Sequence, residues 1–199
     1  METLLTRSFT KWLPLVVAIT GVFGFSYVAV QQNYRQSMND PQIQMAEDAA
    51  ISLARDYTPA NVVPRGVVPI DIKESLAPWI TVYDASGTPL ESNAVLDNAP
   101  PHLPTGLFDT TTWRPLKNFV APTGAETRVS WQPRPDVRQA VILVQFLTPH
   151  GVGYVAVGRS MRTTEERIIN LTELAAVAWS TTILATFLTI FLLLALGWL

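Results

Sequence analysis

Residues 153–199 read GYVAVGRSMRTTEERIINLTELAAVAWSTTILATFLTIFLLLALGWL, and the order of segments within them decides the architecture. A β-prone stretch, 153–159, precedes a helix-prone stretch, 161–173, which contains neither proline nor glycine. The helix continues without a breaker into 174–199, which carries no charged residue. An apolar helix of this length matches a hydrocarbon core of about 30 Å. The pattern predicts a folded domain joined by a juxtamembrane helix to a transmembrane helix.

A second uncharged stretch lies near the N-terminus, between Lys11 and Arg35. Its apolar part, 12–30, predicts a first transmembrane helix. A cleaved signal peptide is the alternative, because basic residues precede the apolar run. An uncleaved anchor fits better, since the run exceeds a signal-peptide core of about 7 to 15 residues. The short basic tail, 1–11, is expected in the cytoplasm by the positive-inside rule, which places 31–160 outside and returns the C-terminus to the cytoplasm.

Composition excludes several classes of function. The chain has no cysteine, so disulfides and thiol chemistry are absent. Its net charge is −2, which provides no basic field for nucleic acid. Neither a phosphate-binding glycine loop nor a dinucleotide fingerprint occurs, so we expect neither a cofactor nor enzymatic activity.

The region 31–160 is expected to open with a helix. Asn39-Asp40-Pro41 is a helix-start signal, because a capping side chain precedes proline at the first helical position. Apolar residues then recur at helical spacing and predict one buried stripe of Ile43, Ala46, Ala50, Leu53 and Tyr57. Prolines make 58–68 irregular, and Asp71 is placed to cap a short helix over 71–76.

The remaining segments favour strands. Residues 79–83 and 88–92 predict a β-hairpin around Asp84-Ala85-Ser86-Gly87, and 103–109 a short helical turn. Three further strands are expected, and they suggest a meander: 127–132, 137–147 and 153–159. The sequence thus predicts an α+β domain with about five antiparallel strands in one sheet and helices on one face.

This order of elements, with the 79–92 hairpin and the closing GYVAVGR strand, resembles the PAS-like, single-Cache type of extracytoplasmic sensor domain of bacterial histidine kinases and chemoreceptors. The resemblance implies an inner-membrane protein whose periplasmic domain binds a small ligand between sheet and covering loops. It also implies that the terminal helix relays a small shift or rotation through the membrane. Such receptors continue into a cytoplasmic output region, whereas this sequence ends at Leu199, so we expect a truncated receptor or a separate cytoplasmic signalling partner.

Aromatic walls with guanidinium groups suit small organic anions. The candidate ligand-binding residues on this ground are Tyr83, Trp113, Arg114, Trp131, Arg138 and Tyr154. Core packing is the competing explanation for the strand aromatics, so Trp113 and Arg114, which lie in a predicted loop, are the better candidates. His102 and His150 sit beside prolines without metal-ligand spacing and are expected to be solvated, so no metal site is predicted.

The juxtamembrane helix offers one further interface. Residues at three-four spacing continue across the predicted membrane boundary and would form a helix-helix seam, which predicts a parallel homodimer: Met161, Thr164, Ile168, Leu171, Ala175 and Ala178. Packing of this stripe on the domain itself is an equal alternative. Two functions stay open: a membrane-anchored sensor domain, and an accessory subunit of a membrane complex that holds a partner protein without a small ligand.

Overall fold

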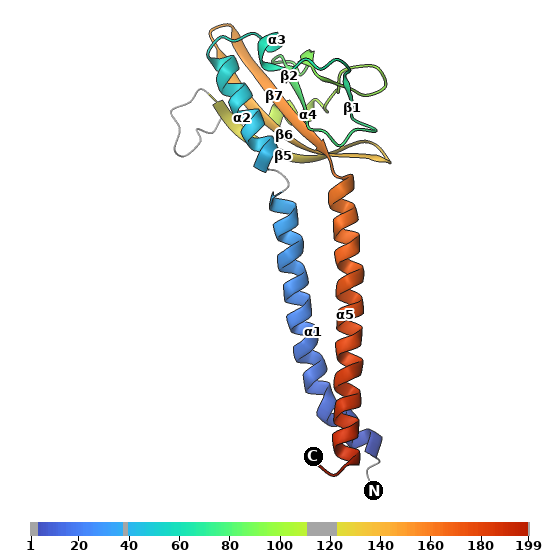
Figure 1. Cartoon of the computed structure of the whole chain (residues 1–199). Coiled ribbons are helices and arrows are strands. Elements are labelled where there is room, and N and C mark those ends of the chain that lie inside the picture. The colour runs from blue at the N-terminus through green and yellow to red at the C-terminus, as the bar shows by residue number, and fades with distance from the viewer. Residues whose placement is uncertain (1–3, 38–39, 111–122, 199) are drawn as a thin grey trace. The chain divides into compact units, whose positions relative to one another are not determined.

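A computed structural model describes residues 4–37, 40–110 and 123–198. They form two compact units, Ser37–Thr163 and the pair of terminal segments Met1–Gln36 and Thr164–Leu199. The first unit is a mixed α+β domain, and two long helices, α1 (Leu4–Ser37) and α5 (Arg162–Ala195), account for the second (Figure 1). The predicted class, an α+β domain with an antiparallel sheet between two apolar helices, is confirmed.

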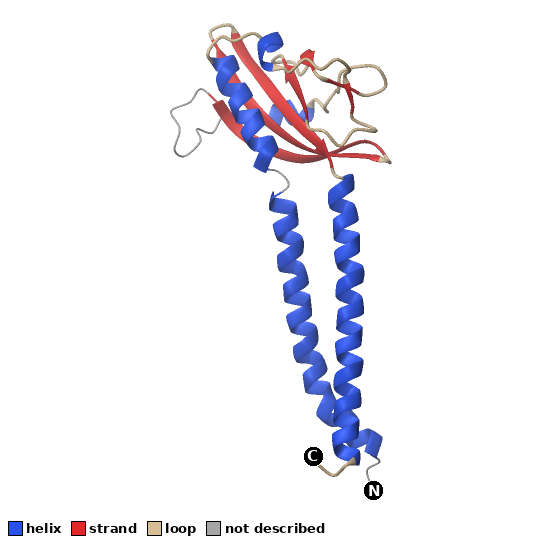
Figure 2. Cartoon of the chain, in the orientation of Figure 1, coloured by secondary structure: helices blue, strands red, loops and turns tan. Residues whose placement is uncertain are grey.

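The domain is built on a five-stranded antiparallel sheet with the order β3-β2-β7-β6-β5 (Figure 2). The strands are β2 (Trp79–Tyr83), β3 (Pro89–Ser92), β5 (Thr123–Arg134), β6 (Val137–Thr148) and β7 (Gly151–Ser160). The last three form the predicted meander, and β2 with β3 forms the predicted hairpin. Strand β7 is central because it pairs with β6 over ten residues and with β2 over five.

One face of the sheet is covered by α2 (Asp40–Ala54), which begins at the predicted position. Three residues of the predicted stripe, Ala46, Ala50 and Leu53, are buried against Val155 and other apolar side chains of the sheet. Small alanines on the helix allow it to approach the sheet closely. Tyr57 is an error in the predicted stripe, because the helix ends before it and its side chain is 57% exposed.

The opposite face is covered by the segment from 70 to 108, not by a second long helix. It contains the short strands β1 (Ile70–Asp71) and β4 (Ala94–Val95), which pair in parallel, and the short helix α4 (Gly106–Thr110). A second apolar cluster forms beneath this cover, and the aromatic side chains in it are Trp79, Tyr83, Phe108, Trp131 and Tyr154. Another short helix, α3 (Pro59–Val62), follows α2 in the region predicted to be irregular.

The predicted helix over 71–76 does not form. Asp71 does receive the expected bond from a backbone N–H, since its Oδ1 accepts from Lys73 N at 2.9 Å. The same residue ends β1, however, and the carbonyl of Asp71 accepts from Ser75 N at 2.8 Å to close a turn. A capping side chain can hold an isolated turn as well as a helix, and Pro78 leaves no room for a second turn.

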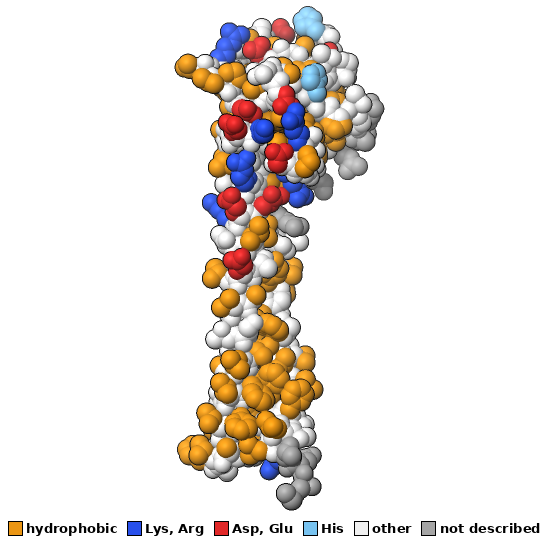
Figure 3. All heavy atoms as spheres, turned by 90° about the vertical axis from the view of Figure 1, so that its right-hand side faces the viewer, with side chains coloured by type: hydrophobic (Ala, Val, Ile, Leu, Met, Phe, Trp, Pro, Cys, Tyr) orange, Lys and Arg blue, Asp and Glu red, His pale blue; other side chains and the backbone are white. Residues whose placement is uncertain are grey.

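Helices α1 and α5 each have the length and apolar character needed to cross a membrane. Each contains 34 residues, so at about 1.5 Å per residue both exceed a hydrocarbon core of about 30 Å. Hydrophobic side chains dominate the surface of the two long helices, whereas charged side chains are concentrated on the domain (Figure 3). This distribution supports a membrane protein with two transmembrane helices.

The contact between β2 and β7 gives a stability prediction. Gly158 pairs with Trp79, and a Cβ built on Gly158 would lie 2.2 Å from Cζ2 of the Trp79 ring. We expect Gly158→Ala to lower the free energy of unfolding of the domain by about 1–3 kcal/mol, because the indole cannot retreat from a packed core. Urea unfolding of the solubilised chain, followed by tryptophan fluorescence, measures this loss.

Gly106→Ala is the matched control, because a Cβ at Gly106 meets no heavy atom within 4 Å. We expect no loss of stability from it. An equal loss in both variants would show that the cost belongs to the glycine backbone and not to the indole.

Candidate functional site

The structure describes four of the six predicted ligand-binding residues, and these four do not lie in one place. Trp113 and Arg114 lie outside the described residues. Tyr83, Trp131 and Tyr154 are buried in the aromatic cluster beneath the 70–108 cover. Arg138 is exposed at the start of β6, where its carbonyl accepts a hydrogen bond from Met161 N at 2.9 Å.

The two buried tyrosines attach the covering segment to the sheet. Tyr83 donates its hydroxyl hydrogen to Pro101 O at 2.7 Å, and Tyr154 donates to Phe108 O at 3.1 Å. The Phe108 ring lies between them, with ring centroids 5.3 Å and 5.1 Å away. Burial raises the pKa of Tyr83, which keeps this hydroxyl protonated as a donor. Both hydroxyls are therefore engaged in holding the fold.

Trp131 likewise has a packing role. Its ring meets Trp79 edge-on at a centroid distance of 6.2 Å. Trp79 Nε1 donates to Gln139 Oε1 at 3.1 Å, and Gln139 Nε2 donates to Ile72 O at 3.0 Å. This buried chain of hydrogen bonds links strands β2 and β6 to the covering segment. These contacts are explained by core packing, which the sequence analysis gave as the alternative to ligand binding.

A cleft lies at one end of the domain, between the end of α2, the β2–β3 turn and the β6–β7 hairpin, and Tyr83 is the predicted ligand-binding residue that lines it. We name it the hairpin cleft, and its volume is about 430 Å³. Its apolar lining includes Leu53, Leu90, Phe146 and Val152, and its polar lining includes Asp56, Asp84, Thr148 and His150. An apolar cavity with a few polar groups, in this size range, is the usual form of a small-molecule site.

Asp56 reaches the cleft from the end of α2 through an unusual backbone conformation. Tyr57 N donates to Ser52 O at 3.2 Å and Asp56 N donates to Leu53 O at 3.0 Å, which is the Schellman pattern of helix termination. The residue at the centre of that pattern must be left-handed, and Asp56 has φ 71°. Glycine is the usual residue there because a Cβ is disfavoured in this region. Asp56 thus presents a carboxylate where the fold would prefer no side chain.

Asp84 contributes the second carboxylate. Its Oδ1 accepts from Ser86 Oγ at 2.6 Å, from Thr88 N at 2.8 Å and from Ser86 N at 2.8 Å. The Ser86 hydroxyl and the Thr88 amide hold the pKa of Asp84 below its usual range. The turn therefore keeps a negative charge at the wall of the cleft.

His150 belongs to the β6–β7 hairpin and is exposed, as predicted. Its Nε2 lies 3.9 Å from Asp56 Oδ1, so the hairpin and the end of α2 face each other across the cleft. Across the described ranges of the chain, no group of three or more histidine, aspartate or glutamate side chains is placed to hold a metal ion.

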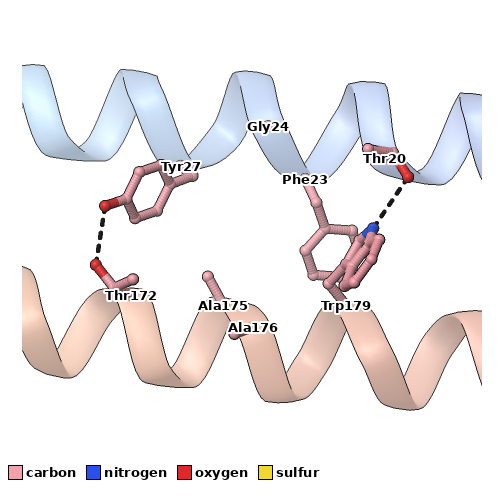
Figure 4. A pocket seen from close by; sticks show the side chains of 8 residues that line it. All are labelled: Thr20, Phe23, Gly24, Tyr27, Thr172, Ala175, Ala176 and Trp179. Atoms are coloured by element: carbon pink, nitrogen blue, oxygen red, sulfur yellow. Dashed lines mark hydrogen bonds between the residues drawn. The ribbon is translucent and has the colours of Figure 1, made fainter.

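The long helices contain a separate apolar groove of about 270 Å³ (Figure 4). Trp179 Nε1 of α5 donates to Thr20 Oγ1 of α1 at 3.0 Å, and the hydroxyls of Tyr27 and Thr172 are 2.8 Å apart. Ala175 lines the groove between these two hydrogen bonds. This member of the predicted dimer seam therefore faces the first helix of its own chain; the homodimer stays a prediction.

Comparisons with known proteins leave the family open. No family model matches the chain, and no curated protein and no solved structure matches it significantly. The resemblance to PAS-like and Cache sensor domains therefore rests on the order of elements and on the antiparallel sheet.

Sequence reasoning identified Tyr83 as a ligand-binding residue but missed the other residues that line the hairpin cleft. Asp56 follows a helix whose end carries no glycine, so the sequence gives no sign of a left-handed residue there. Asp84 was identified only as a turn residue, which is also its structural role. The cleft forms where three chain segments come together at one end of the sheet. Local sequence patterns do not predict contacts between segments that are far apart in the chain.

The conformation of Asp56 gives a second stability prediction. Asp56→Gly should raise the free energy of unfolding, because relief of a left-handed Cβ is worth about 1–2 kcal/mol and the added freedom of the unfolded chain costs about 0.4–1 kcal/mol. Loss of a negative charge at a helix C-terminus acts in the same direction. The expected net gain is roughly 0.5–1 kcal/mol, measured by urea unfolding. Asp56→Ala, which keeps the Cβ, should not reproduce the gain; a less stable glycine variant would contradict this account.

Proposed function

We propose that this chain is a membrane-anchored extracytoplasmic sensor whose domain binds a small molecule in the hairpin cleft and relays its occupancy through α5. The observation that carries the proposal is the position of β7. Its first residues, Gly151, Val152 and Gly153, line the cleft, and its last residue, Ser160, is followed after one residue by α5. A single strand thus joins a ligand-sized cavity to a membrane-length helix.

The first two residues of α5, Arg162 and Thr163, belong to the domain unit, and the residues at this junction are hydrogen-bonded to the domain. Met161 N donates to Arg138 O at 2.9 Å, and Arg162 Nη2 donates to Lys73 O at 2.7 Å. The proposed relay runs from β7 through Met161, the one residue between the strand and α5. The proposal places α1 and α5 in the inner membrane of a bacterium, with both termini cytoplasmic, and assigns the domain to a PAS-like or Cache-like type.

The accessory-subunit function is supported by a different observation. Val67 and Val68, in the connection after α3, are 104% and 74% exposed. Two adjacent apolar side chains exposed to this extent suit contact with a partner protein. A sensor that works with a separate cytoplasmic partner does not need this contact. The double variant Val67→Ser, Val68→Ser should therefore abolish complex formation if the chain is an accessory subunit and leave it unchanged if the chain is a sensor.

The proposed topology predicts a labelling pattern. The chain has no cysteine, so each introduced cysteine is the only one. In spheroplasts of a bacterial host, a membrane-impermeant maleimide should label Ala85→Cys, which lies on an exposed turn of the domain. Trp198→Cys, at the end of α5, should be labelled only after permeabilisation. Labelling of Trp198→Cys in intact spheroplasts, or protection of Ala85→Cys, would refute the topology.

Ligand binding is tested by filling the cleft. Thr58 lines the cleft, is exposed and makes no side-chain capping hydrogen bond, so Thr58→Trp should block the cleft at little cost to the fold. The 199-residue chain in nanodiscs is screened by thermal unfolding against small amines, carboxylates, alcohols and amino acids. A ligand at about 100 times its dissociation constant adds about 2.7 kcal/mol, which raises the midpoint by several degrees.

Asn61→Trp is the matched control, because Asn61 is exposed on α3 and is not part of the described lining of the cleft. We expect a stabilising compound to act on the wild type and on Asn61→Trp but not on Thr58→Trp. If no compound shifts the midpoint, or if Thr58→Trp responds like the wild type, the proposed function fails.

A further inference from the structure

The charge of the hairpin cleft identifies the class of its ligand. We infer that the cleft binds a small organic cation, an amine on a short apolar or aromatic body, between the carboxylates of Asp56 and Asp84. This inference rests on the proposed function and specifies what the sensor detects. It reverses the charge expected from the sequence, which favoured an organic anion held by arginine.

The described residues that line the cleft carry two carboxylates and no lysine or arginine. Arg138, the described arginine among the predicted ligand residues, is not part of this lining. The C-terminal end of α2 adds partial negative charge from its last carbonyls. His150 is the one side chain in the described lining that can carry a positive charge. Its Nε2 lies 3.9 Å from Asp56 Oδ1, so the carboxylate of Asp56 is its neighbour. An organic anion would meet repulsion here.

The walls match the body of such a ligand. Leu53 and Phe146 are buried side chains at the inner end of the cleft, and Leu90 lies at its more exposed part. Tyr57, which is 57% exposed, adds an aromatic face beside Asp56. Ammonium groups are attracted to aromatic faces as well as to carboxylates. A volume of about 430 Å³ lies in the range of small-molecule pockets.

The position of Asp56 gives an independent reason. The residue is left-handed and carries a negative charge at a helix C-terminus, and both features oppose stability. Glycine or asparagine would close the same Schellman pattern without this charge. Residues held in unfavourable backbone conformations are concentrated at ligand sites, where the arrangement serves binding and not stability. The carboxylate at the mouth of the cleft fits that description.

Two probes that share a phenylethyl body and carry opposite charges test the inference: 2-phenylethylamine and 3-phenylpropanoate. Each is added to the 199-residue chain in nanodiscs, and binding is measured by the thermal midpoint and by titration calorimetry. We expect 2-phenylethylamine to bind and 3-phenylpropanoate not to bind. Asp56→Asn keeps the shape of the side chain and should weaken amine binding about tenfold or more, the effect of losing one charged hydrogen bond.

Asp136→Asn is the matched control, since Asp136 is an exposed aspartate in the β5–β6 turn outside the described lining. It should leave the affinity for 2-phenylethylamine unchanged. If 3-phenylpropanoate binds and Thr58→Trp abolishes its effect, the cleft takes anions, so this inference fails while the proposed function stands. If Asp56→Asn and Asp136→Asn weaken amine binding equally, the inference also fails. If neither these probes nor the wider panel bind, both fail.

Discussion

The architecture of the domain depends on one constraint: the central strands of its sheet are apolar on both faces. Val155 and Val157 of β7 point into the cluster beneath α2, whereas Tyr154 and Ala156 of the same strand belong to the cluster beneath the 70–108 cover. A sheet of this kind must be covered twice, because each exposed apolar face costs free energy in proportion to its area. Helix α2 covers one face and the 70–108 segment covers the other.

The sequence predicted the parts of the fold that local periodicity controls. The start of α2, the hairpin after Trp79, the closing meander and the continuous helix α5 follow from capping residues, β-propensity and turn chemistry, and all are present. The neighbour relation between β2 and β7 could not be predicted, since the strands are far apart in the chain. The predictions of a helix over 71–76 and of Tyr57 in the buried stripe are wrong for the same reason. A capping residue or an apolar stripe indicates that a helix can form but does not determine how many residues it spans.

The candidate site was less accessible to sequence reasoning. Aromatic residues at Tyr83, Trp131 and Tyr154 were chosen as ligand contacts because of their chemistry, but the same chemistry also suits a core that must attach a mostly irregular cover to a sheet. The two tyrosine hydroxyls donate to backbone carbonyls of the cover, and the Trp131 ring packs on Trp79. The hairpin cleft shares Tyr83 with that set, but its other lining residues include an aspartate at a helix end and the glycines of a hairpin, and local sequence patterns do not predict that these segments meet.

For a sensor of the proposed kind, occupancy of the cleft must differ in free energy between two positions of the elements that line it. The cleft has walls from α2 and from the β6–β7 hairpin, so a ligand bound in it would contact both. Asp56 stands at the end of α2, which packs on one face of the sheet, whereas His150 and Gly151 stand on the β6–β7 hairpin. A cation attracted to Asp56 and packed against the hairpin would resist their separation. Strand β7 pairs with β6 over its whole length and with β2 over residues 154–158, and Met161 alone separates it in sequence from α5.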